Sequence, residues 1–506
     1  MSPALILALI LAYFSVLLLI SWFTGKKATN KTFFLANKSA PWYLVAFGMI
    51  GASLSGITFI SVPGKVGNPL DQMSYLQMVM GFVVGYFFIA YVLIPVYYKL
   101  GVTSIYQYLE RRFGVTAYKT GAFYFLLSRS IGASIRLLLV ATVLQEILFD
   151  AWDIPFWFTV VFSILLIWIY TFKGGIKTII FTDTLQTAFM LISLGLSIYL
   201  ISDHLNLGAT EIIPAIAESD YSQIWQFDNL FGNQFHFLKE FLGGLLICIT
   251  MTGMDQDMMQ KNLACPNIKD AQKNMVSFAI TLGIVNIFFM GLGALLFMYQ
   301  ADVGLELPLS ASGSSRNDLL FPLAALNQAE FGVALGVFFL LGLIAAAYSS
   351  ADSALTSLTT SVCVDFLDID EKEEKQQLKL RKQVHVIMSV VLFVIVMILN
   401  AALDMSAIMM VIFLAALTYG PLLGIFLFGL FTKRTTQPIW FIVFAVISPL
   451  LSFGVHLITK MEAVHFNFGS LLIGLNAGLM FLGLLITSKP VPKEEAFRLS
   501  LQTDEK

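Results

Sequence analysis

The chain alternates between long apolar runs and short polar segments. A transmembrane helix needs about 20 consecutive apolar residues, and the sequence read on that scale predicts thirteen spans. Their ranges are 3–22, 42–63, 74–98, 120–148, 155–172, 179–202, 238–256, 275–299, 332–361, 384–402, 406–431, 437–459 and 466–487. The first run has neither a basic segment before it nor a small-residue cleavage site, so we expect a retained helix and not a signal peptide. The pattern predicts an all-α polytopic membrane protein.

Most basic residues fall on one side of the predicted membrane. Cytoplasmic segments are enriched in Lys and Arg, and an N-terminus outside with a C-terminus inside places all but six of the 30 basic residues in such segments. The exceptions are Lys65, Lys239, Arg316 and Lys460 in external segments and Arg129 and Arg136 inside a span. Lys261 is assigned to the cytoplasmic loop after the seventh span. We therefore expect that orientation.

The composition indicates that the protein lies in a lipid bilayer. It also disfavours several classes of function. Of the 506 residues, 58% are hydrophobic and 12% are charged, against about 25% charged in soluble domains. The net charge of -2 and the lack of a basic face disfavour nucleic-acid binding. No nucleophile elbow, phosphate-binding loop or dinucleotide fingerprint occurs, so we expect neither an enzyme nor an ATP-driven transporter.

The second predicted span contains a run of small and polar residues. Its three glycines and three hydroxyl residues are Gly48, Gly51, Ser53, Ser55, Gly56 and Thr58. They weaken the helix in mid-membrane, and a broken helix exposes backbone carbonyls that can coordinate a cation. Close helix packing through small residues is the alternative.

The ninth predicted span carries a polar stripe. Its members follow helical spacing and are Ala346, Ser349, Ser350, Ser353, Ser357 and Thr360. The neighbouring Asp352 adds a carboxylate, which is costly inside a membrane unless it has a role. Oxygen ligands of this kind suit a hard cation. The alternative is a set of serines that only joins helices.

Other charged and amide groups also fall within spans. Asp183 in the sixth span either pairs with Lys177 one turn earlier or faces the polar stripe of the ninth span. Arg129 and Arg136 share one face of the fourth span, and their partner is either an internal acid or the carboxylate of a substrate. Gln77 in the third span is suited to hydrogen-bonding a ligand.

Five stretches resemble signature segments of the sodium/solute symporter family. They are Thr103–Gly114, Gly174–Gln186, Asp255–Leu263, Ala346–Ser350 and Gly420–Arg434. The resemblance covers nearly the whole chain and implies the inverted-repeat fold of the leucine-transporter type, with broken helices opening both repeats. The implied parts are an extra N-terminal helix and loop (1–41), a first repeat (42–202), an external loop (203–237), a second repeat (238–431), two C-terminal helices (432–487) and a cytoplasmic tail (488–506).

The resemblance also implies sodium sites. The family's general site would use the backbone carbonyls of Gly51, Leu54 and Ala346 and the hydroxyls of Ser349 and Ser350. Some members, notably bacterial sialic acid symporters, hold a second sodium ion. Its ligands here would be Asp183, Ser349, Asp352 and Ser353. Asp352 stands where a serine is expected, so it would either tighten sodium binding or carry a proton.

The same resemblance implies a solute pocket. Ser53, Ser55, Thr58 and Gln77 lie where sialic acid symporters hold their ligand, and Arg129 or Arg136 would bind a carboxylate. The implied function is sodium-coupled import of a sialic acid, a sugar or a hydroxylated monocarboxylate by alternating access. The alternative is a passive facilitator or channel of the same fold. We expect a monomer in a bacterial inner membrane, with Na⁺ as the coupling ion.

Overall fold

The computed structural model describes residues 3–25, 30–309, 313, 315–402, 407–459 and 466–491. Lys460 and residues 492–506 of the predicted tail lie outside this range. The N-terminal half contains α1 (Pro3–Thr24), α2 (Asn30–Leu35), η1 (Ala36–Lys38), α3 (Trp42–Ser53), α4 (Gly56–Lys65), α5 (Tyr75–Phe88), η2 (Ile89–Leu93), α6 (Ile94–Leu100), α7 (Gln107–Phe113), α8 (Val115–Leu144), η3 (Gln145–Phe149), η4 (Asp150–Trp152), α9 (Phe156–Gly174) and α10 (Ile176–His204).

The second half is equally helical. It contains α11 (Ile212–Glu218), α12 (Phe237–Cys248), η5 (Ile249–Gly253), α13 (Gln256–Leu263), α14 (Ile268–Val303), η6 (Asn317–Leu319), α15 (Leu320–Ala325), α16 (Gln328–Ser361), η7 (Val362–Phe366), η8 (Ile369–Glu371), α17 (Glu374–Ala402), α18 (Ala407–Phe431), α19 (Pro438–Thr459), η9 (Gly469–Leu471) and α20 (Leu472–Thr487). Two-residue strands, β1 (Arg434–Thr435) and β2 (Lys489–Pro490), pair antiparallel beyond the ends of α18 and α20.

The helices confirm an all-α polytopic membrane protein. Within the described residues, ten helices are long and apolar enough to cross a bilayer, and counting two bent pairs as one span each gives twelve. The prediction of thirteen differs by the range 155–172, where the apolar part of α9, Phe156–Phe172, is short. At about 1.5 Å per residue, the 19 residues of the whole helix α9 reach about 28 Å, close to the hydrocarbon thickness of about 30 Å. The thirteenth span stays a prediction.

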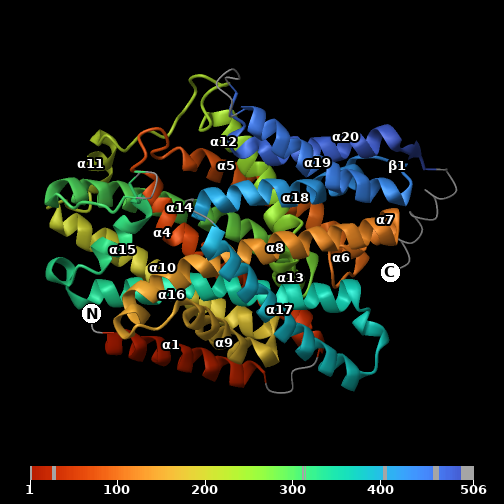
Figure 1. Cartoon of the computed structure of the whole chain (residues 1–506), viewed down its shortest axis with the longest axis horizontal. Coiled ribbons are helices and arrows are strands. Elements are labelled where there is room, and N and C mark those ends of the chain that lie inside the picture. The colour runs from red at the N-terminus through yellow and green to blue at the C-terminus, as the bar shows by residue number, and fades with distance from the viewer. Residues whose placement is uncertain are drawn as a thin grey trace.

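Several long helices, including α1, α8, α16 and α18, run roughly along the long axis of the molecule, and α17 crosses that direction obliquely (Figure 1). In this view α1 and α9 form one edge, α19 and α20 the opposite edge, and α8, α16 and α18 lie between them. Helix α10 packs along both α16 and α3, and α12 packs along α5. This packing places the polar positions of α3, α10 and α16 in the interior rather than against lipid.

Two helix pairs are sharply broken inside the molecule. The axis bends by 61° between α3 and α4 and by 61° between α12 and α13. At the first break, Leu54 (ψ 70°) and Ser55 (ψ 169°) leave the helical region, which agrees with the expected effect of the glycines and hydroxyls there. The second break follows the π-helical turn η5. Each pair begins one of the two predicted repeats.

Candidate functional site

The break between α3 and α4 frees backbone groups in the interior. In a continuous helix the Ser55 amide would donate to the Gly51 carbonyl, but here it donates to the Ser53 carbonyl at 2.9 Å. The Gly51 amide also donates to Thr187 Oγ1 on α10 at 3.0 Å. The unwound backbone is therefore held by a neighbouring helix while a carbonyl is released for another ligand.

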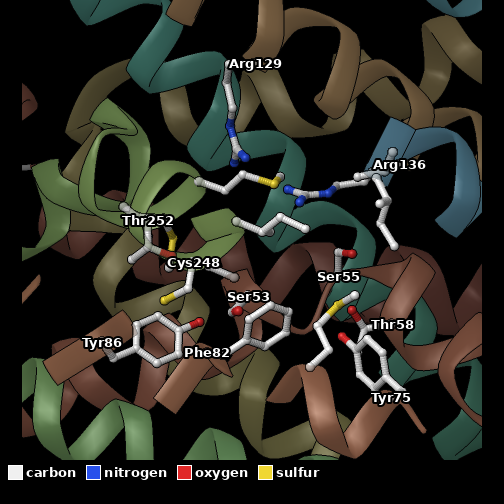
Figure 2. Close-up of a pocket in the computed structure, with 17 residues that line it drawn as sticks. Ser53, Ser55, Thr58, Tyr75, Phe82, Tyr86, Arg129, Arg136, Cys248 and Thr252 are labelled. Carbon is white, nitrogen blue, oxygen red and sulfur yellow. The ribbon is translucent and has the colours of Figure 1, made fainter. Parts of the chain in front are cut away.

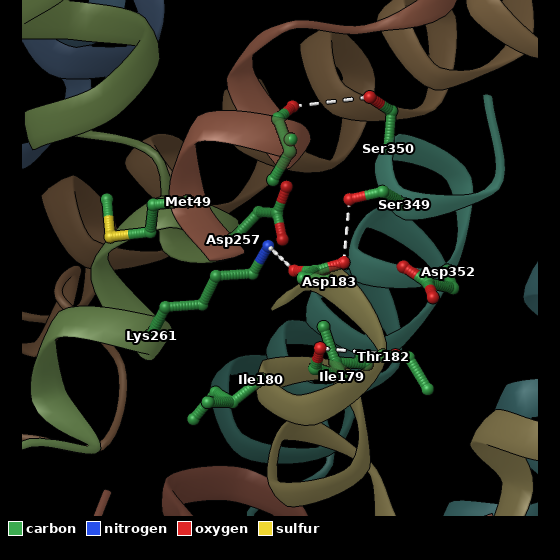
Figure 3. Close-up of polar contacts among 12 residues, drawn as sticks. Met49, Ile179, Ile180, Thr182, Asp183, Asp257, Lys261, Ser349, Ser350 and Asp352 are labelled. Carbon is green, nitrogen blue, oxygen red and sulfur yellow. Dashed lines mark hydrogen bonds and ion pairs between the residues drawn. The ribbon is translucent and has the colours of Figure 1, made fainter. Parts of the chain in front are cut away.

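Helix α16 lies directly against this break. Ser350 Oγ donates to the Ala52 carbonyl at 3.2 Å (Figure 3), and a Cβ on Gly56 would lie 3.8 Å from the Ala347 Cα. Ala346, Ser349 and Ser350 are fully buried. The structure thus brings the α16 members of the first predicted sodium set to the broken backbone that carries Gly51 and Leu54.

The second predicted set joins α10 to α16. Ser349 Oγ donates to Asp183 Oδ1 at 2.6 Å. Asp352 accepts a hydrogen bond from Tyr170 of α9 at 2.5 Å, while its Oδ1 atom and Ser353 Oγ find no hydrogen-bond partner in the described part of the chain. All four predicted members are fully buried. The contact of Ser349 with Asp183 joins α10 to α16, and the contact of Tyr170 with Asp352 joins α9 to α16.

Lys261 changes the interpretation of this region. Its Nζ atom lies 2.7 Å from Asp183 Oδ2, and both side chains are 1% exposed (Figure 3). Assigning Lys261 to a cytoplasmic loop was therefore wrong, because the chain resumes as α13 after the second break and carries the residue inward. Pairing Asp183 with Lys177 was also wrong, since the partner comes from the other repeat.

Five of the six predicted solute residues line a cavity of about 140 Å³ (Figure 2). Ser53, Ser55 and Thr58 line it from the first break, and both predicted arginines line it from α8. Figure 2 shows the two guanidinium groups on one side and the three hydroxyls across from them. Aromatic and apolar walls complete the cavity, including Tyr75, Met78, Phe82, Tyr86, Met251 and Ile412.

The two arginines have different partners. Arg129 forms a buried ion pair with Asp257 of α13, so for this residue the internal-acid alternative is correct. For Arg136 the structure gives no ion pair with any described residue, and its buried Nε atom lacks a hydrogen-bond partner within the described ranges. Arg136 is thus the arginine with capacity for a ligand's carboxylate.

Gln77 does not line the solute cavity. Its Nε2 atom donates to the Phe235 carbonyl at 3.0 Å, and its Oε1 atom accepts from the Gln226 amide at 3.1 Å. The side chain therefore holds the loop 203–237 against α5. An inspection of the third span alone could not separate this role from ligand binding.

Two residues of α13 were missed as functional candidates. Asp257 and Lys261 are four positions apart and therefore share one helix face. Asp257 forms an ion pair with Arg129, which lines the solute cavity. Lys261 forms an ion pair with Asp183 of the predicted ion site. Two signals in the sequence could have found them: this acid–base spacing, and their position in Asp255–Leu263, one of the stretches that resemble signature segments of the family.

A smaller cavity of about 90 Å³ adjoins the solute cavity. Its lining includes Lys65 and Glu240. Met78 and Ile412 line both cavities, so they form the partition between them.

The chain is similar to characterised transporters over most of its length. Residues 33–440 match the model of the sodium:solute symporter family. The sodium/sialic acid symporter SiaT of Proteus mirabilis is 27% identical over 441 residues, with 84% of each chain covered. The human sodium/iodide cotransporter is 25% identical over 401 residues, which cover 77% of this chain and 60% of that protein.

Solved structures support the same fold. A substrate-bound, outward-open Na⁺-coupled sialic acid symporter matches with a TM-score of 0.79 at 22% identity, over 96% of this chain and 99% of that one. The nucleobase-cation symporter Mhp1 matches with a TM-score of 0.50 at 13% identity, over 94% and 98% of the two chains. The fold is of the leucine-transporter type. The chain belongs to the sodium:solute symporter family, as a multi-pass, sodium-coupled transporter and not an enzyme.

Proposed function

We propose that this protein imports a small hydroxylated carboxylate together with sodium, and that a sialic acid is the first solute to test. The observation that carries the proposal is the unpaired Arg136 guanidinium in a cavity lined by three hydroxyls. A partly buried cation that forms no ion pair with a described residue favours an anionic ligand, and the planar guanidinium matches a carboxylate. The sialic acid relatives agree with this chemistry.

The first sodium ion would bind where α16 meets the broken helix. Its ligands would be the carbonyls of Gly51, Leu54 and Ala346 and the hydroxyls of Ser349 and Ser350. The freed Gly51 carbonyl and the contact between Ser350 and the Ala52 carbonyl support this placement.

A second sodium ion at Asp183, Ser349, Asp352 and Ser353 stays a prediction. The Lys261 ammonium lies against Asp183, the acid of that set, and any account of a second ion must include it.

Transport would proceed by alternating access between two five-helix repeats, 42–202 and 238–431. The thirteen spans would place the N-terminus outside and the C-terminus in the cytoplasm of a bacterial inner membrane, and the protein would act as a monomer. Sodium would stabilise the outward-open state by joining α16 to the broken helix. Movement of the repeats would then release ion and solute inward.

The sodium gradient is sufficient for accumulation. One charge crossing about 100 mV releases roughly 2.3 kcal/mol, and a tenfold concentration gradient adds about 1.4 kcal/mol. Together they would sustain on the order of 500-fold accumulation per sodium ion.

Uptake into proteoliposomes tests the proposal. Labelled N-acetylneuraminic acid, a hexose and a short monocarboxylate are supplied with an inward sodium gradient or with choline in its place. We expect sodium-dependent accumulation of the sialic acid. Equilibration without accumulation would indicate a passive facilitator, and accumulation of the hexose alone would contradict the role of Arg136.

A further inference from the structure

The ion pair between Asp183 and Lys261 occupies the acid of the predicted second sodium site. Lys261 Nζ lies 2.7 Å from Asp183 Oδ2, and Ser349 Oγ donates to Asp183 Oδ1 at 2.6 Å. Both oxygens of this carboxylate therefore have partners, and the pair is buried between α10, α13 and α16 (Figure 3). The charge of Asp183 is therefore already balanced by Lys261, and Asp352, the other carboxylate of the set, accepts a hydrogen bond from Tyr170.

We infer that the Lys261 ammonium takes the place of a second sodium ion, so that the transport cycle uses only the sodium ion at the Ser350 site. This inference rests on the proposed sodium symport and specifies its stoichiometry. A sodium ion and an ammonium both carry one positive charge and both prefer oxygen ligands. Two such charges on one buried carboxylate would repel each other with little screening by water.

The position of Lys261 is fixed by its helix. On either side of it, Gln260 donates to the Phe34 carbonyl at 2.7 Å and Asn262 donates to the Met258 carbonyl at 3.0 Å. Asp257, one turn earlier on the same face, is already paired with Arg129. The ammonium is thus a tethered cation and does not depend on the sodium concentration.

This arrangement also implies a positioning role for Asp183. Because the Ser349 hydroxyl donates a hydrogen bond to Asp183, the lone pairs of the Ser349 oxygen are left to face the first sodium ion. Asp183 would therefore position a ligand of the first ion, and Lys261 would be its counter-ion. No second sodium ion is needed to balance that carboxylate.

Counting bound sodium tests the inference without a solute. Purified full-length protein in detergent is titrated with ²²Na⁺ in a scintillation proximity assay calibrated by protein amount. We expect one sodium ion per wild-type chain and two per chain for Lys261→Gln, whose Asp183 is left uncompensated. Lys261→Arg keeps the charge and should bind one. The double variant Lys261→Gln/Asp183→Asn removes both charges and should also bind one.

The outcomes separate this inference from the proposed function. Two sodium ions on the wild-type chain, or one on Lys261→Gln, would overturn the assignment to Lys261. A wild-type chain that binds none would overturn sodium symport itself. If Lys261→Gln does not yield a monodisperse protein, the wild-type count still tests the stoichiometry, and two sodium ions there would overturn the inference.

Discussion

Replacing Arg136 by glutamine removes the cavity cation that has no internal partner. No described carboxylate pairs with Arg136, so its loss leaves no buried acid uncompensated, and the cost should fall on ligand binding rather than on folding. A charge-assisted contact to a ligand carboxylate contributes about 2–3 kcal/mol. The dissociation constant of N-acetylneuraminic acid should therefore rise about 30- to 150-fold.

Arg129→Gln is the matched control on the same helix face. Arg129 pairs with Asp257, which is fully buried, and breaking a buried pair costs about 3–5 kcal/mol of stability. We expect a clear loss of thermal stability for Arg129→Gln and little change for Arg136→Gln.

Binding of the acid and its methyl ester at saturating sodium distinguishes a carboxylate contact from a general disturbance. Wild-type protein should prefer the acid, and Arg136→Gln should bind both compounds equally and weakly. A preference for the acid that persists in Arg136→Gln would refute the reasoning, because the carboxylate would then be bound elsewhere.

Three further predictions concern other parts of the site. Ser350→Ala removes a proposed sodium ligand, so the half-saturating sodium concentration for uptake should rise at least about tenfold; an unchanged sodium dependence would contradict the site. Gly51→Ala places a Cβ 2.4 Å from Thr187 Oγ1, so the melting temperature in detergent should fall, and Thr187→Ala in the same chain should restore part of it. Gln77→Ala removes the contacts that hold the loop 203–237, so it should lower thermal stability more than solute affinity at equilibrium; the reverse order would assign Gln77 to the ligand.

The elements of the fold could be predicted because lipid restricts the chain so strongly. Backbone groups in the bilayer must pair within the segment, so apolar runs of sufficient length become helices. The first break was also predictable, since Gly51, Ser55 and Gly56 favour other conformations within an apolar run. The second break was less evident, because the π-helical turn η5 extends the helix before it and hides the polar segment α13.

The partners of the buried charges could not be predicted in the same way. Asp183 lies near Lys177 in sequence, but it pairs with Lys261, 78 positions away. Arg129 likewise meets Asp257, 128 positions away. Such pairs depend on how helices from opposite repeats pack, and a hydropathy pattern contains no information about that packing.

The partition between the two cavities has a consequence for kinetics. It consists of Met78 and Ile412 side chains, and an unbranched methionine changes rotamer easily. Rotamer changes take picoseconds to nanoseconds, whereas collective helix motions take microseconds to milliseconds. Opening of this partition would therefore not limit turnover, whose rate the slower helix motions would set.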